Sequence, residues 1–134
     1  MTPAILLKYV TDTMAIVSYL SKRKMPVAVK QLFQATDLGS ASIYMPAIVL
    51  VEIGYLSEKG RIDVSIQDVL KHLFTFPNYS EQPLTFDIIA ESYKITDIPE
   101  LHDRLIAGTA KFLNLGLITN DPLIQASTFV KTIW

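Results

Sequence analysis

Residues 5–13 read Ile-Leu-Leu-Lys-Tyr-Val-Thr-Asp-Thr, an apolar run that ends in an acid between two threonines. The segment 5–10 is short and mostly apolar, which is typical of a buried strand. Residues 13–24 then place apolar side chains three and four positions apart, which predicts a helix. Asp12 is therefore expected at the junction of a strand and a helix.

The strand-then-helix order of this opening segment repeats along the chain. Further strands are expected over residues 43–45, 83–86, 117–119 and 129–134. Further helices are expected over residues 26–39, 47–58, 65–73, 87–94 and 101–114. Such alternation predicts an α/β fold with a mainly parallel central sheet, in which functional groups collect at the carboxyl ends of the strands.

The composition indicates one domain over residues 1–134 and limits the kinds of site it can hold. Half of the 134 residues are hydrophobic, which is enough for one well-buried core. Cysteine is absent, which excludes disulfides, thiolate zinc sites and cysteine nucleophiles, and two histidines are too few for most imidazole metal centres. Any metal ion is therefore expected to be held by oxygen atoms.

The apolar segments are too short for a membrane protein. The longest, residues 43–51, stops at Glu52, far short of the roughly 20 residues that a membrane-spanning helix needs. The N-terminal apolar run is interrupted by Lys8 and lacks the features of a secretion signal. We expect a cytoplasmic protein without membrane contact.

The chain is nearly neutral, with 12 Lys and Arg residues, 13 Asp and Glu residues and a net charge of -1. It therefore lacks the basic excess of a non-specific nucleic-acid binder, and RNA binding would have to rely on local charge. The only compact basic cluster is residues 22–24, with Lys30 a little further on. We interpret this cluster as a solvated helix end that the helix dipole favours.

Glu52 is the acid that is hardest to explain by structure alone. Apart from Glu52 itself, all residues between Met45 and Leu56 are apolar, proline or glycine. An ionised carboxylate on an apolar helix face costs several kcal/mol unless it is paired or binds a metal, and no Lys or Arg lies within helical reach. A metal-binding or catalytic role is predicted for Glu52.

Three aspartates lie near expected helix starts. Asp12 and Asp121 can each be explained as an N-cap, and Pro122 strengthens that explanation for Asp121. Asp103 suits the first turn of its helix, but its spacing to Ile106 turns it toward the interior. Each of these three acids has a structural explanation when it is taken alone.

Taken together, the four acids predict a metal site. If the sheet brings them together, mutual repulsion raises their pKa values or destabilises the empty site, and a divalent cation removes that conflict. Carboxylate oxygens suit Mg²⁺ and Mn²⁺, which activate a water and neutralise charge on a phosphoryl group. Hydrolysis of a phosphodiester is the chemistry that this pattern favours.

Four short motifs spread along the chain carry a family resemblance. They are Val10-Thr11-Asp12-Thr13, Glu52-Ile53, Asp103-Arg104-Leu105-Ile106-Ala107 and Ile118-Thr119-Asn120-Asp121. With these motifs in this order and at these positions, the chain resembles the PIN-domain family, and within it the VapC-like ribonuclease toxins of type II toxin-antitoxin pairs. The resemblance implies a three-layer α/β/α fold and an endoribonuclease that uses Mg²⁺ or Mn²⁺. It assigns catalysis and metal binding to Asp12, Glu52, Asp103 and Asp121.

The resemblance also implies supporting residues and partners. Thr13, Thr119 and Asn120 become candidates for holding the acids or a water molecule. An RNA substrate, a cognate antitoxin that blocks the acidic pocket, and a homodimer are implied as partners. Many relatives carry hydroxyl residues at two positions before the helical glutamate, where this chain has Ala47 and Val49.

Two other functions fit part of the pattern. A PIN-like domain that binds RNA or a protein without cutting is compatible with the missing hydroxyls and the low net charge. A receiver-like phosphoacceptor also gathers acids around magnesium. Against the receiver, no lysine follows a late core strand, and the first strand ends in one acid rather than two.

Two charged side chains beside Asp103 have simpler interpretations than catalysis. We interpret His102 as a solvated or capping residue at a helix start rather than as a general base. We interpret Arg104 as an ion-pair partner of Glu100 at the four-residue spacing, with a contact to substrate phosphate as the alternative.

Overall fold

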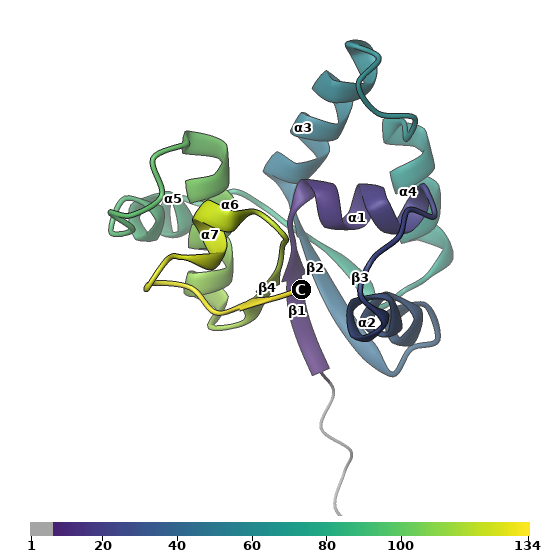
Figure 1. Ribbon diagram of the computed structural model, residues 1–134, viewed down its shortest axis with the longest axis horizontal. Coiled ribbons are helices and arrows are strands. Elements are labelled where there is room, and N and C mark those ends of the chain that lie inside the picture. Colours follow the sequence, from purple (N-terminus) through teal and green to yellow (C-terminus); the bar gives the residue numbers. More distant parts are fainter. Residues whose placement is uncertain (1–6) are drawn as a thin grey trace, which may run out of the picture.

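The computed structural model describes residues 7–134, which form a five-stranded sheet with helices on both sides (Figure 1). The strands are β1 Leu7–Thr11, β2 Ala41–Pro46, β3 Tyr79–Gln82, β4 Gly116–Ile118 and β5 Thr132–Ile133. Their order across the sheet is β3-β2-β1-β4-β5, and every neighbouring pair is parallel. The predicted α/β fold with a mainly parallel sheet is confirmed. Residues 5 and 6 of the predicted first strand lie outside the described residues.

Helices connect the strands on both sides of the sheet. They are α1 Thr13–Leu20, α2 Val27–Asp37, α3 Ala47–Glu58, α4 Ile66–Thr75, α5 Phe86–Ser92, α6 Leu101–Leu113 and α7 Pro122–Gln125. In Figure 1, α1, α2 and α4 lie on one side of the sheet, whereas α5, α6 and α7 lie on the other. Within the described part of the chain, no helix is long and apolar enough to span a membrane.

Local sequence signals set several helix boundaries. Ser65 and Asp68 form a capping box at the start of α4: the Asp68 N–H donates to Ser65 Oγ at 3.1 Å, and the Ser65 N–H donates to Asp68 Oδ2 at 2.9 Å. Gly39 follows α2 with a φ of 86°, which glycine adopts without steric cost. The first helix is shorter than the predicted 13–24, because Lys22 takes a left-handed φ of 57°.

The predicted strand over residues 83–86 is wrong, since the third strand is β3 at the edge of the sheet. In β3 only Tyr79 is buried, so its sequence lacks the apolar pattern that identifies a strand. Asn78 ties its start to β2, because the side-chain amide donates to a carbonyl of that strand at 2.8 Å. Thr85, in the predicted strand, instead caps α5 by accepting a backbone N–H. The last strand is likewise shorter than the predicted 129–134.

β1 is the middle strand, and its neighbours set the position of a crevice. From β1 the chain passes to β2 on one side, and it returns from β3 to β4 on the other side. A crevice forms at the carboxyl ends of parallel strands where such connections diverge. Asp12 follows β1 and Asp121 follows the end of β4, and the Asp12 N–H donates to the Ile118 carbonyl at 3.1 Å. The two aspartates therefore flank this crevice.

α5 and α6 pack against each other closely. A Cβ atom at Gly108 of α6 would lie 1.9 Å from the Ser92 hydroxyl of α5 and 2.8 Å from the Ser92 Cα atom. Both residues are buried. Only glycine allows this approach, so Gly108 fixes the position of α6, the helix that carries Asp103.

Candidate functional site

A pocket of about 350 Å³ lies at the carboxyl end of the sheet. Its lining consists of Asp12, Thr13, Met14, Glu52, Leu56, Asp103, Ile106, Asn120, Asp121 and Pro122. The structure therefore brings the four predicted acids to one pocket, together with two of the three predicted supporting residues. Among the described residues that line it, none is lysine, arginine or histidine. The apolar part of the lining was not singled out from the sequence, because its members look like ordinary core residues.

Asp12 is both the N-cap of α1 and the most buried acid of the pocket. Its Oδ1 accepts the Ala15 N–H at 2.8 Å, and only 6% of the residue is exposed. Burial raises the pKa of Asp12 to about 6, although hydrogen bonds from the Thr119 hydroxyl and the Ala15 N–H lower it. The value of about 6 includes smaller upward contributions from the negative charges of Asp121 and Glu52.

Asp121 likewise has two structural roles, because it caps α7 and also lines the pocket. Its Oδ1 accepts the N–H groups of Leu123 at 2.9 Å and Ile124 at 3.2 Å. Its own N–H donates to Thr119 Oγ1 at 3.1 Å. Thr119 is fully buried and does not line the pocket, but its hydroxyl accepts the Asp121 N–H and lowers the pKa of Asp12.

Glu52 enters the pocket from α3 and is held by α1. The Thr13 hydroxyl donates to Glu52 Oε1 at 2.6 Å, and Thr13 itself is buried. Glu52 is half-buried, and α3 fully buries only Val49 and Ile53. Glu52 stands on the predicted apolar helix, but most residues of that helix are only partly covered in this chain.

Asp103 lies in the first turn of α6 and interacts electrostatically with the other three acids of the pocket. Its backbone N–H donates to Glu100 Oε2 at 2.6 Å, so the helix cap is Glu100. Burial first, and then the negative charges of Asp121, Glu100, Glu52 and Asp12, together raise the pKa of Asp103 to about 7. Sequence reasoning missed this role of Glu100, although its position three residues before Asp103 is the spacing of a cap.

The charged neighbours of Asp103 lie outside the pocket lining. The predicted ion pair between Arg104 and Glu100 is wrong: the Arg104 guanidinium donates to the carbonyls of Ile98 at 2.8 Å and Pro99 at 3.3 Å. It also lies over the Tyr93 ring, 5.7 Å from its centroid. His102 Nδ1 lies 2.9 Å from Glu100 Oε1, and both side chains are about half exposed.

The donor set of the pocket fits a hard divalent cation, although the acids do not form a closed coordination shell. The negative charges of the neighbouring acids raise the pKa values of Asp12 and Asp103, and no cationic side chain is among the described residues that line the pocket. A bound cation relieves this electrostatic setting. Within residues 7–134, however, no three acidic or imidazole side chains already surround a common ion-sized point. The acids share the pocket and would have to draw together around an ion.

The chain matches a known family over most of its length. The family model described as PIN domain matches residues 9–126. None of the curated protein sequences compared with the chain matches it. The family match therefore rests on the segment that contains all four acids.

Solved structures with the same fold cover nearly the whole chain. VapBC2 from Rickettsia felis, bound to a fragment of its promoter, is 18% identical with a TM-score of 0.71 and covers 96% of this chain and 99% of that one. A toxin-antitoxin complex from Klebsiella pneumoniae is 17% identical with a TM-score of 0.64, covering 94% and 96%. Mycobacterium tuberculosis VapC20, a sarcin-ricin loop cleaving toxin, is 14% identical with a TM-score of 0.65, covering 92% and 97%. At such identities the likeness shows a shared fold.

Proposed function

Since the chain belongs to the PIN domain family, we propose that it is a metal-dependent endoribonuclease. The observation that carries the proposal is the pocket in which four carboxylates gather without a cationic side chain among its described lining residues. Such a pocket favours a divalent cation and repels the phosphates of RNA until a cation is bound. RNA as the substrate follows the resemblance to the ribonuclease toxins of the family.

Asp12, Glu52, Asp103 and Asp121 would hold Mg²⁺ or Mn²⁺, since both ions prefer carboxylate oxygens. When bound, the ion neutralises charge on the phosphoryl group and activates the water that attacks it. The raised pKa values of Asp12 and Asp103 mean that both carboxyls must lose protons before they hold a cation well.

Three polar residues support the acids in this proposal, and two of them do so by direct contact. Thr13 orients Glu52 through its hydroxyl, which donates to Oε1 at 2.6 Å. Thr119 supports Asp121 by accepting its backbone N–H at 3.1 Å, and the same hydroxyl favours the charged form of Asp12. Asn120 is an exposed member of the pocket lining, and in this proposal its amide would hold a water.

We further propose that the protein is the toxin of a cytoplasmic toxin-antitoxin pair and acts as a homodimer with an antitoxin as its second partner. The support is the uncovered apolar surface around α3, where Val51 is 62% exposed and Tyr55 is 53% exposed. Apolar helix faces of this kind are usually covered by another protein surface. The Klebsiella pneumoniae complex of the same fold is described as a toxin-antitoxin complex.

The test is RNA cleavage by purified protein in Mg²⁺ or Mn²⁺. Asp12→Asn and a chelator should each abolish cleavage of a long single-stranded RNA. Glu58→Gln is the matched control, since Glu58 is an exposed acid at the end of the helix that carries Glu52 and does not line the pocket. Calorimetric titration with Mn²⁺ should show binding that the Asp12 variant loses and the Glu58 variant keeps.

Two results would contradict this function. Cleavage that survives both the chelator and Asp12→Asn would mean that the four acids are not the reaction site. Tight RNA binding by the unmodified protein without any cleavage in Mn²⁺ would favour the alternative, a PIN-like domain that binds RNA without cutting.

A further inference from the structure

A second pocket, of about 410 Å³, lies at the opposite end of α1 from Asp12. Its lining residues come from α1, the α1–α2 loop, α2 and α4, and they are Tyr19, Leu20, Lys22, Arg23, Met25, Lys30, Gln34 and His72. No acid is among the described residues that line it. Two members of the basic cluster 22–24 and the more distant Lys30 therefore meet at one concave surface, which sequence spacing did not predict.

The helix dipole does not explain this gathering of cations. Lys22 and Arg23 follow the C-terminus of α1, where a cation is favoured. Lys30, however, lies near the N-terminus of α2, where the dipole disfavours a cation. Arg23 is only weakly paired, 3.9 Å from an exposed Asp63. The interpretation of the cluster as a solvated helix end therefore accounts for two of the three cations at most.

Lys22 is also held in an unfavourable backbone conformation. The Lys22 N–H donates to the Tyr19 carbonyl at 3.2 Å, and the Arg23 N–H donates to the Ser18 carbonyl at 2.9 Å. This pair of bonds is the helix C-terminal motif whose left-handed residue is usually glycine. Lys22 occupies that position with a φ of 57°. A lysine therefore stands at a backbone position that glycine would occupy with less strain.

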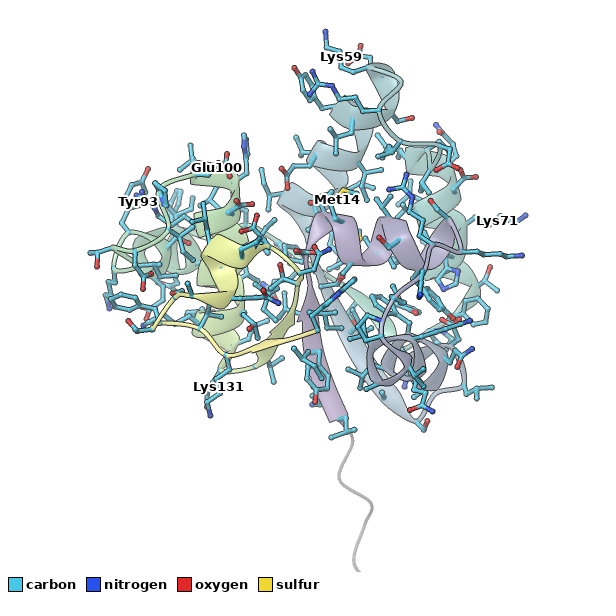
Figure 2. All side chains as sticks on the ribbon, viewed as in Figure 1. Met14, Lys59, Lys71, Tyr93, Glu100 and Lys131 are labelled. Carbon is cyan, nitrogen blue, oxygen red and sulfur yellow. The ribbon has the colours of Figure 1, made fainter. Side chains whose placement is uncertain are left out.

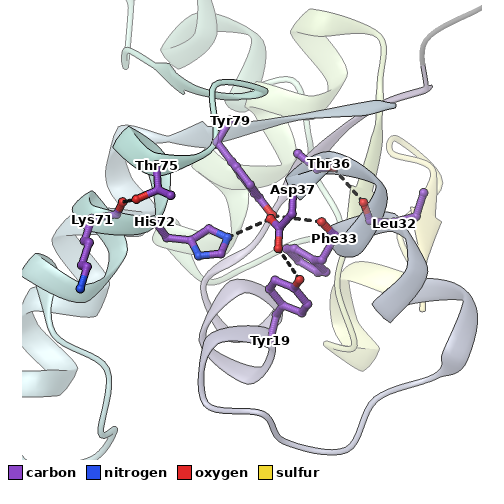
Figure 3. Close-up of polar contacts among 9 residues, drawn as sticks. All are labelled: Tyr19, Leu32, Phe33, Thr36, Asp37, Lys71, His72, Thr75 and Tyr79. Atoms are coloured by element: carbon purple, nitrogen blue, oxygen red, sulfur yellow. Dashed lines mark hydrogen bonds and ion pairs between the residues drawn. The ribbon is translucent and has the colours of Figure 1, made fainter. Parts of the chain in front are cut away.

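The rings at the base of this pocket are fixed by a polar network (Figure 3). The Tyr19 hydroxyl donates to Asp37 Oδ2 at 2.5 Å, the Tyr79 hydroxyl donates to Asp37 Oδ1 at 2.6 Å, and His72 Nε2 lies 2.9 Å from the same Oδ1. Tyr19 also stacks on Phe33 with ring centroids 4.7 Å apart. Two rings are therefore presented to the pocket in fixed positions by a carboxylate that lies outside its lining.

We propose that this pocket binds a nucleotide of the RNA strand outside the cleavage site. Lys22 and Lys30 each contact one of the two phosphates that flank it, and the base lies against the rings of Tyr19 and His72. Fixed rings beside several cations are the combination by which proteins hold single-stranded nucleic acid. The eight residues of α1 span about 12 Å, which separates this nucleotide from the acidic pocket at the other end of the helix. The inference rests on RNA being the substrate.

The first experiment measures RNA binding without cleavage. A labelled single-stranded oligoribonucleotide is titrated in chelator, with fluorescence anisotropy as the readout, at several salt concentrations. The double variant Lys22→Gln/Lys30→Gln should bind about 25-fold more weakly at 0.1 M salt and lower the salt slope by about 1.4, at about 0.7 for each lost phosphate contact. The control Lys24→Gln/Lys59→Gln removes the same charge from exposed lysines outside the pocket and should bind nearly as the unmodified protein does.

A second variant separates a binding role from a structural one. Lys22→Gly should raise the melting temperature, because glycine relieves the left-handed strain, yet weaken RNA binding about fivefold. In the cleavage assay the Lys22→Gln/Lys30→Gln variant should raise KM and leave kcat unchanged. Weaker binding by a more stable protein cannot result from damage to the fold.

The outcomes distinguish this inference from the proposed function. Equal RNA affinity of the pocket variant and its control would overturn the inference even if the protein cleaves RNA. Tighter binding of a polyglutamate peptide than of RNA at Lys22 and Lys30 would also overturn it, in favour of an acidic peptide. If the pocket variant loses RNA affinity as expected while the unmodified protein never cuts, the inference stands and the nuclease function fails.

Discussion

Asp12→Asn should stabilise the cation-free protein at pH 8 and leave its stability almost unchanged at pH 4. The folded chain holds Asp12 buried beside two other acids, so charging it is unfavourable. Asparagine removes the charge but keeps the helix cap, because it accepts the Ala15 N–H as aspartate does. Asp12→Asn, which should abolish the proposed activity, is therefore expected to make the folded protein more stable.

The magnitude follows from the pKa of Asp12. Its rise from 3.8 to about 6 corresponds to about 3 kcal/mol, at about 1.4 kcal/mol for each pH unit. Because the folded pKa is the higher one, the folded state binds more protons between pH 4 and 6, and the free energy of unfolding falls as pH rises through that window. The variant does not lose stability in this way. The difference in free energy of unfolding between the variant and the unmodified protein therefore grows between pH 4 and 6 and reaches its full size by pH 8.

Urea unfolding in chelator at pH 4 and pH 8 measures this advantage, with Glu58→Gln as the control for loss of an exposed charge. Adding Mn²⁺ at about 1,000 times its Kd should reverse the order, since the ion then stabilises the unmodified protein by about 4.1 kcal/mol, which exceeds the advantage of the variant. Equal stability of variant and unmodified protein at pH 8, or the same gap at both pH values, would refute the reasoning.

Three further predictions concern the acids and the packing behind them. Cleavage should rise with pH between 6 and 7, because Asp103, whose pKa is about 7, must be ionised to hold a cation; initial rates that stay flat from pH 5 to 8 would contradict this. Thr13→Val should lower Mn²⁺ affinity or kcat about 10-fold or more by freeing Glu52, and Thr13→Ser should restore it. Gly108→Ala should cost about 1 to 3 kcal/mol in urea unfolding, because the new methyl meets Ser92; an unchanged midpoint would show that α5 and α6 can move apart.

The parallel sheet and the meeting of the acids could be predicted because both depend on local patterns. Asp12 follows one apolar strand and Asp121 follows another, and parallel strands end at the same edge. The sequence presents capping and pocket lining as alternatives for these two residues. In the structure each aspartate does both, since one carboxyl oxygen caps a helix and the side chain still lines the pocket.

Features that depend on long-range packing could not be predicted. The polar edge strand β3 shows no apolar pattern because only Tyr79 faces the core. Arg104 turns to backbone carbonyls instead of Glu100, which depends on the path of the preceding loop. The surroundings of Glu52 depend on how much of α3 is covered, and an apolar sequence does not distinguish a helix buried in this chain from one that a partner would cover.

The central place of β1 has a consequence for synthesis on the ribosome. β1 is made first, but its neighbour β4 is among the last segments made, and Asp12 meets Asp121 only when both strands are paired. A nascent chain that ends before residue 121 lacks one of the four acids, so no such fragment can carry the complete pocket. Contacts this distant in sequence also slow folding. Met14 of α1, which is labelled in Figure 2, lines the same pocket and is also made early. An activity that depends on the pocket is therefore withheld until translation of the domain is almost complete.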